Sequence, residues 1–184
     1  MRTCLQCGDH SEEHEPMCSW CKRSRVGING RGEISPITIA VDMDGVLTDF
    51  RKKYFELKSN DLEWPQCQPG FFANLEPIPG AIEGFKYLWD NFDAYILTRP
   101  MVVNVDSYKE KAIWIREHFG LDVLHKLALN PQKQRNKGHF LIDDTTDAGQ
   151  IEFEGILLKF GPDHHDWNSI KEFFKNVSKV YHVV

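Results

Sequence analysis

The sequence predicts an α/β protein in which a parallel sheet is flanked by helices, preceded by a small metal-binding module. Three observations lead to this prediction. Short apolar runs typical of buried strands alternate with segments of helical periodicity. Carboxylate-bearing residues follow directly after two of these runs. Four of the five cysteines lie within the first 21 residues, and the rest of the chain is long enough for one well-packed domain.

The predicted strands and helices alternate over residues 37–177. The strand signals are Ile37–Val41, Ala94–Leu97, Val123–Leu129, Phe140–Ile142 and Ile156–Phe160. The helix signals are Ala81–Asn91 after the turn PIPG, Val105–Phe119 before Gly120, and Trp167–Val177 with Asp166 as N-cap. Strand–helix alternation of this kind favours a parallel sheet with helices on both faces. Within the second helix, an apolar stripe is expected to face the core: Tyr108, Ala112, Ile115 and Phe119.

The cysteines near the N-terminus form two Cys-x2-Cys pairs, CLQC and CSWC, separated by ten residues. Two such pairs can supply the tetrahedral set of four thiolates that structural zinc favours. We therefore expect residues 1–26 to be a zinc-binding module, and because it has few large apolar residues, the metal would supply its folding energy. Two disulfides or a redox pair are the alternatives. The zinc ligands would be Cys4, Cys7, Cys18 and Cys21.

Residues 27–35 are glycine-rich and polar, and we expect them to link the module to a domain over residues 36–184. Basic residues follow the second cysteine pair and could contact nucleic acid: Lys22, Arg23, Arg25 and Arg31. Acidic residues in the same module favour a solvated face of mixed charge. The net charge of −5 argues against a protein that mainly coats nucleic acid.

We expect a cytoplasmic protein without a membrane partner. No apolar run is long enough to span a bilayer. Residues 2–21 lack the hydrophobic segment of a signal peptide. In a reducing compartment, cysteines bind metal more often than they form disulfides.

The ends of the predicted strands carry the candidate catalytic residues. The first strand ends in Asp42 and Asp44, the second in Thr98, and the fourth in Asp143 and Asp144. Ligands of open α/β sheets bind beyond the carboxyl ends of the strands, so we expect these side chains to meet at one edge. Because so many carboxylates would repel one another, the pattern predicts a divalent cation, and hard oxygen ligands select Mg²⁺.

Asp42 and Asp44 are two residues apart, a spacing at which side chains on a strand share a face. Met43 would pack on the other side, and Gly45 would allow a sharp turn and the approach of N–H groups to an anion. One aspartate could then attack phosphorus while the other protonates the leaving oxygen, with Thr98 and a lysine holding the phosphate.

These motifs resemble those of the haloacid dehalogenase superfamily of phosphohydrolases. DMDGVLTD is similar to motif I, the threonine of ILTRP to motif II, a lysine upstream of the fourth strand to motif III, and LIDD to motif IV. With FFANLEPIPGAIEGFKYL, SYKEKAIWIREHFG and DWNSIKEF in this order, the chain resembles the 5'(3')-deoxyribonucleotidases of that superfamily over residues 37–178. The cysteine module lies outside the resemblance.

The resemblance implies a Rossmann-like fold and a magnesium-dependent phosphatase of deoxyribonucleoside monophosphates. Asp42 would be the nucleophile that forms an aspartyl-phosphate, and Asp44 would be the general acid and then the base. Mg²⁺ would be held by the Asp42 carboxylate, the Asp44 carbonyl and one of Asp143 and Asp144. The phosphoryl oxygens would be held by Thr98 and Lys133, with Lys137 as the alternative lysine.

The chain departs from the family at two points. The cap, about residues 50–72, is shorter than the resemblance implies, so a DNA or RNA end could also enter. Arg99 stands where the family tends to carry a small hydroxyl residue, and it could bind phosphate or pair with a carboxylate. Phe50 is expected to line the nucleoside pocket. Other aromatic residues of the cap could stack on a base: Trp64, Phe71 and Phe72.

Two alternatives to a mononucleotide phosphatase remain open. The short cap and the basic residues favour a phosphatase of polynucleotide ends, or of another phosphorylated metabolite. A non-catalytic adaptor, in which the cysteine module recruits a partner, is the second alternative. The intact set of motif residues argues against the adaptor.

Overall fold

The structure is a computed structural model that describes residues 2–3, 10–11, 26–28, 34–147 and 149–181. Two short antiparallel ribbons lie in the N-terminal part. One pairs β1 (Arg2–Thr3) with β2 (His10–Ser11), and the other pairs β3 (Val26–Ile28) with β4 (Ile34–Pro36). The second ribbon occupies both ends of the expected linker. The four cysteines predicted to bind zinc lie outside the described residues: Cys4, Cys7, Cys18 and Cys21.

A five-stranded parallel sheet forms the centre of the domain, in the order β7-β6-β5-β8-β9. The central strand β5 (Thr38–Val41) pairs with β6 (Asp93–Thr98) on one side and with β8 (Phe140–Asp143) on the other. The outer strands are β7 (Leu127–Leu129) and β9 (Ile156–Lys159). The predicted parallel sheet is confirmed, and this order brings the ends of β5, β6 and β8 together.

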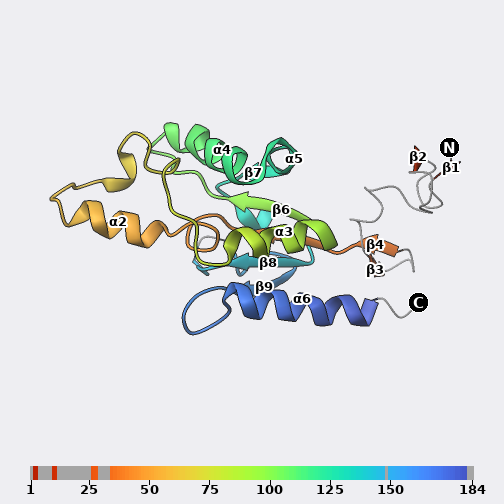
Figure 1. The fold of residues 1–184 in the computed structure, drawn as a ribbon. Coiled ribbons are helices and arrows are strands. Elements are labelled where there is room, and N and C mark those ends of the chain that lie inside the picture. The colour runs from red at the N-terminus through yellow and green to blue at the C-terminus, as the bar shows by residue number, and fades with distance from the viewer. Residues whose placement is uncertain (1, 4–9, 12–25, 29–33, 148, 182–184) are drawn as a thin grey trace.

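The helices are α2 (Phe50–Lys58), α3 (Ala81–Asn91), α4 (Asp106–Phe119), α5 (Leu121–Leu124) and α6 (Trp167–Tyr181). Short 3-10 turns form at Pro65–Cys67 and Lys133–Arg135. Figure 1 shows α2 projecting away from the sheet, on the side opposite to the C-terminal end of α6. The predicted helices are confirmed, and α6 is longer than expected. No helix in the described part is long and apolar enough to cross a membrane.

The prediction of one strand over Val123–Leu129 is wrong in its first half. Gly120, at φ +84°, ends α4, and the chain turns directly into the short helix α5. Val123 is buried by this helix, whereas only Leu127–Leu129 pairs with the sheet. A short apolar run does not distinguish a buried helical turn from a strand. The sequence therefore predicted one strand where the structure has the helix α5 followed by the strand β7.

Side chains along the strands alternate between two apolar clusters, as a period of two requires. The larger cluster contains Ile39 and Ile142 and includes residues of α3, α4 and α6. The smaller cluster contains Ala40, Leu141 and Phe153 and, among the described residues, no helical one. Helices flank the sheet, as predicted. The face that carries the smaller cluster is covered by the irregular segment around Phe153, where we expected a helix.

The buried face of α4 differs from the predicted apolar stripe. Tyr108 is 36% exposed, whereas Glu110 and Lys111 are buried along with Trp114 and Ile115. The Glu110 carboxylate accepts the backbone N–H groups of residues 70 and 72, at 2.6 and 3.0 Å. Buried charged groups are tolerated when they are paired or hydrogen-bonded, so two charged residues occupy positions that an apolar pattern cannot identify.

Candidate active site

The first motif forms a tight turn directly after β5. The carbonyl of Met43 accepts three backbone N–H groups, at 2.8, 2.9 and 3.4 Å, and Gly45 adopts φ +82°. A Cβ at Gly45 would lie only 2.5 Å from the carboxyl carbon of Asp144, so both the backbone conformation and the close approach require glycine. The turn buries Met43 and leaves Asp42 and Asp44 lining one cavity, as their spacing predicts.

This cavity, which we name the catalytic pocket, has a volume of about 690 Å³ and lies at the carboxyl edge of the sheet. Its size falls within the usual range for small-molecule sites. Residues of α2 form one part of its wall, and residues that follow β5, β6 and β8, together with the 3-10 turn at Lys133, form the rest. The wall includes Asp42, Asp44, Gly45, Phe50, Arg51, Tyr54, Phe55, Arg99, Lys133, Asp144, Thr145, Asp147 and Gln150.

Lys133 joins the aspartates of two strands. Its Nζ lies 2.8 Å from Oδ1 of Asp42 and 2.6 Å from Oδ2 of Asp143. The lysine is almost completely buried. Burial by itself lowers the pKa of Lys133, but attraction to Asp42 and Asp143 outweighs that effect and leaves its pKa above the usual value. Lys133 is therefore a fixed positive charge beside Asp42.

The two aspartates at the end of β8 have different surroundings. Asp143 is fully buried, and its second oxygen, Oδ1, accepts Thr145 N at 3.0 Å and Gln150 Nε2 at 3.1 Å. The Asp144 carboxylate makes no side-chain hydrogen bond or ion pair within the described residues. Burial, together with repulsion by Asp42 and Asp143, raises the pKa of Asp144 to about 7. Asp144 is thus the carboxylate with oxygens available to a ligand.

The aspartate cluster can hold a divalent cation. Asp42, Asp143 and Asp144 each place one carboxylate oxygen within 4.8 Å of the others. An all-oxygen set suits Mg²⁺. Burial and repulsion by Asp42 and Asp143 raise the pKa of Asp144, and a bound cation would relieve the repulsion.

A second buried lysine, Lys111 of α4, holds Asp44. Its ammonium group contacts the Asp44 carboxylate and donates to Thr98 Oγ1 at 2.8 Å and to the Arg99 carbonyl at 2.9 Å. It also lies 5.0 Å from the centre of the Phe72 ring. Burial raises the pKa of Asp44, and the opposing attraction of Lys111 does not cancel that effect. Asp44 therefore retains a proton to a higher pH than an exposed aspartate does.

Comparison with known proteins identifies the family. The family model described as 5' nucleotidase, deoxy (pyrimidine), cytosolic type C protein matches residues 62–171. A protein of Vibrio phage KVP40 assigned as a 5'(3')-deoxyribonucleotidase is 35% identical over 147 residues, covering 77% of this chain and 86% of the phage protein. The chain belongs to this nucleotidase family.

The mitochondrial 5'(3')-deoxyribonucleotidase of Mus musculus is also similar, at 31% identity over 172 residues, covering 73% of this chain and 78% of the mouse protein. Membership of this nucleotidase family makes the chain a phosphoric monoester hydrolase, in agreement with the activity that the motifs predict.

The other motif residues of this nucleotidase lie at different depths. Thr98 is fully buried at the end of β6, where its hydroxyl accepts Lys111. Arg99 is exposed and lines the catalytic pocket. Lys137, the alternative to Lys133, is exposed and does not line this pocket, and its carbonyl accepts the Tyr95 hydroxyl at 2.9 Å. The geometry therefore favours Lys133.

The aromatic wall of the pocket differs from the predicted one. Phe50 lines the pocket as expected, together with Tyr54 and Phe55, which follow it on α2. Trp64 is 57% exposed and Phe72 is buried, and neither lines the pocket. Phe72 is held inward because its N–H donates to a buried carboxylate and its ring packs over a buried ammonium group.

Sequence reasoning did not identify Lys111, Tyr54 or Phe55. Lys111 lies within SYKEKAIWIREHFG, a stretch that supports the family resemblance, so a signal was present. Tyr54 follows Phe50 at helical spacing, and Phe55 is the next residue. Aromatic residues farther along the cap were equally good candidates by residue type, so the sequence did not single out these two.

Proposed function

We propose that this chain hydrolyses deoxyribonucleoside monophosphates through an aspartyl-phosphate on Asp42. The observation that carries the proposal is the position of Asp42, which lies against the Lys133 ammonium at 2.8 Å and faces a pocket that Asp44 also lines. A nucleophilic carboxylate, a fixed positive charge and a protonatable carboxyl thus converge on one small cavity. The phage and mouse relatives are named as 5'(3')-deoxyribonucleotidases, which supports this substrate class.

The proposed reaction has two steps. An oxygen of Asp42 attacks phosphorus, the bond from phosphorus to the sugar oxygen breaks, and Asp44 gives its proton to that oxygen. Asp44 then takes a proton from water, whose oxygen attacks phosphorus and releases inorganic phosphate from Asp42. The raised pKa of Asp44 suits the first step, and the adjacent Lys111 suits the second because it favours the ionised form.

We propose that the Asp42 and Asp144 carboxylates and the Asp44 carbonyl hold Mg²⁺. Asp143 is better placed as their support, because one of its oxygens binds Lys133 and the other accepts hydrogen bonds from Thr145 and Gln150. The bound ion would neutralise negative charge on the phosphoryl oxygens. Lys133 would contact the same oxygens from the protein side, and Arg99 lines the pocket where it could join them.

The nucleoside would lie against the aromatic residues of α2. Phe55 is 64% exposed although it lines the pocket, and Phe50 and Tyr54 stack with ring centres 5.9 Å apart. A base that stacks on such a wall would remove apolar surface from water. The Phe55→Ala variant is expected to have a KM raised by about tenfold, as the loss of one stacking contact implies.

The test is phosphate release from a panel of nucleoside 5'- and 3'-monophosphates with Mg²⁺. We expect turnover of the deoxyribonucleotides and complete loss in Asp42→Asn. Asp90→Asn, at an exposed aspartate of α3, is the matched control and should keep full activity. Turnover in Asp42→Asn, or turnover confined to phosphates that are not nucleotides, would contradict the proposal.

We also propose that Cys4, Cys7, Cys18 and Cys21 bind one structural zinc ion. The support is the spacing of the two Cys-x2-Cys pairs, which suits a closed tetrahedral site. Metal analysis of protein purified without added zinc should find about one equivalent. That equivalent should disappear when Cys4 and Cys18 are replaced by serine, and should persist in Cys67→Ser, because Cys67 is exposed and far along the chain.

A further inference from the structure

A second cavity, larger than the catalytic pocket, adjoins the metal-binding edge of the site. Its volume is about 1150 Å³, and it lies between the β9–α6 connection and the start of α2. Gly45, Arg51 and Asp144 line both cavities, so the two meet beside the catalytic aspartates. A nucleoside monophosphate fits within the catalytic pocket alone. The adjoining cavity therefore offers room for a further part of the substrate.

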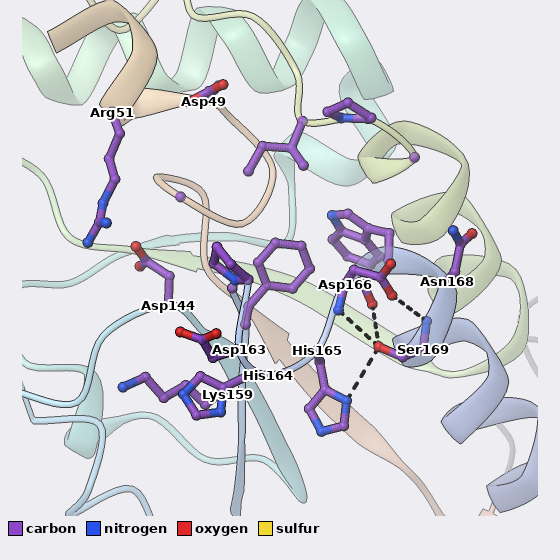
Figure 2. Close-up of a pocket in the computed structure, with 18 residues that line it drawn as sticks. Asp49, Arg51, Asp144, Lys159, Asp163, His164, His165, Asp166, Asn168 and Ser169 are labelled. Atoms are coloured by element: carbon purple, nitrogen blue, oxygen red, sulfur yellow. Dashed lines mark hydrogen bonds between the residues drawn. The ribbon is translucent and has the colours of Figure 1, made fainter. Parts of the chain in front are cut away.

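Two basic side chains line this second cavity without forming an ion pair within the described residues, although the Arg51 charge acts on Asp144 and opposes the rise of its pKa. Arg51 is exposed and Lys159 is partly buried, and neither makes a side-chain hydrogen bond or an ion pair within the described residues. Figure 2 shows Arg51, Lys159, Asp144 and Asp163 gathered on one side of the cavity. Lys159 is the last residue of β9 and stands in register with Asp143, at the same edge of the sheet as the catalytic residues.

The acidic residues of the same wall are mostly engaged elsewhere. Asp49 caps α2, where its Oδ1 accepts Lys52 N at 3.0 Å. Asp166 accepts Ser169 N at 2.7 Å in the first turn of α6, as Figure 2 shows. Asp144 belongs to the cation cluster. Asp163 is exposed, and its negative charge would repel an anion bound in this cavity.

We propose that Arg51 and Lys159 bind a second phosphate, carried by the nucleoside that leaves. This inference rests on the proposed function, and it extends the substrate class from deoxyribonucleoside monophosphates to deoxyribonucleotides that carry a second phosphate group. The first phosphate is hydrolysed on Asp42, and the second is bound but not transferred. Basic groups that make no ion pair within the described residues, in a cavity that adjoins the catalytic pocket, can provide the charge-assisted hydrogen bonds that a phosphate accepts.

The experiment compares kcat/KM for deoxythymidine 5'-monophosphate, deoxythymidine 3',5'-bisphosphate and a 5'-phosphorylated dinucleotide. We expect the second phosphate to raise kcat/KM, and Lys159→Gln to remove about tenfold of that gain, the value of one charge-assisted contact. Lys159→Gln should leave the monophosphate rate unchanged. Lys86→Gln, at an exposed lysine of α3 outside both cavities, is the matched control.

Asp163→Asn should act in the opposite direction, because it removes the negative charge that opposes the second phosphate. A Lys159-dependent gain with the bisphosphate identifies a free nucleotide as the source of that phosphate, and a gain with the dinucleotide alone identifies a polynucleotide end. Equal kcat/KM for all three substrates, or an equal loss with all of them in Lys159→Gln, would overturn the proposal.

Calorimetric titration of Asp42→Asn with the bisphosphate separates this subsite from catalysis. We expect Kd to rise about tenfold when Lys159→Gln is added to that variant, and an unchanged Kd would refute the subsite. If Lys159 governs binding but the unmodified active site releases phosphate from none of the nucleotides, the proposed function fails while the subsite stands.

Discussion

Replacing Lys111 with methionine removes the ammonium group but keeps a side chain of similar length. Lys111 is fully buried and donates to the Asp44 carboxylate, Thr98 Oγ1 and the Arg99 carbonyl. Removing one partner of a buried ion pair costs about 3–5 kcal/mol. Because the Asp44 side chain is 24% exposed and can take up a proton, we expect the lower end, about 3 kcal/mol. That loss corresponds to a fall in Tm of about 6–12 °C.

The same substitution should divide the two chemical steps. Burial raises the pKa of Asp44, and Lys111 is the group that most opposes this, so its loss raises the pKa further. A protonated Asp44 can still protonate the leaving oxygen, but it cannot accept a proton from water until the pH exceeds its pKa. The second step should therefore slow by about tenfold for each unit of pKa change at neutral pH, and recover as the pH rises.

The assay is rapid-mixing hydrolysis of p-nitrophenyl phosphate. Lys111→Met should release a fast burst of about one equivalent of nitrophenolate, followed by slow turnover, because the aspartyl-phosphate accumulates. The matched control is Lys109→Met, which changes an exposed lysine of the same helix. If Lys111→Met has the same Tm as the control and shows neither a burst nor a shifted pH profile, Lys111 does not act through Asp44.

Glycine substitutions test the close packing at Gly45, beside the site, and at Gly84, between α3 and α6. Gly45→Ala should weaken Mg²⁺ binding by about tenfold, the lower end for disturbing a metal site, because its Cβ would displace the Asp144 carboxylate. Gly120→Ala has the same backbone strain, at φ +84°, but no atom within 4 Å of the added Cβ, so calorimetry should find its Mg²⁺ affinity unchanged. Equal affinities in the two variants would contradict the steric argument. Gly84→Ala should cost about 2 kcal/mol in urea denaturation, because the Cβ would lie 2.7 Å from Cδ2 of the Trp167 ring and closer still to its Cε3. An unchanged urea midpoint would mean that α3 and α6 can move apart to accommodate the methyl group without loss of stability.

The parts of the site that lie at strand ends could be predicted from the sequence. Asp42 and Asp44 follow a fully apolar run, and their spacing determines that they face one side while Met43 packs into the core. Asp143 and Asp144 lie at the end of β8, the strand beside β5, and the same reasoning predicts their position. These predictions depend only on local periodicity and on the rule that parallel strands end at one edge.

The remaining parts depend on contacts between distant segments. Lys111 is buried because Asp44 and Thr98, 67 and 13 residues away, provide partners for its charge. An apolar pattern does not mark such a position, so the predicted face of α4 passed through Tyr108 instead. Phe72 and Trp64 are both aromatic residues of the cap, and the sequence does not distinguish them. The structure shows that Phe72 is buried and that Trp64 is exposed outside the pocket.

The charges at the sheet edge connect the buried lysines with the expected cation. Four carboxylates meet there, from Asp42, Asp44, Asp143 and Asp144, and within the described part of the chain two ammonium groups contact them. The two lysines reach three of the carboxylates, and Asp144 is left without contact to either. When all four carboxylates are ionised, four negative and two positive charges leave an excess of two negative charges, which one divalent cation would neutralise. Burial and repulsion by Asp42 and Asp143 raise the pKa of Asp144 to about 7, and because Asp144 contacts neither lysine, this argues that the cation belongs beside Asp144 and not deeper, beside Asp143.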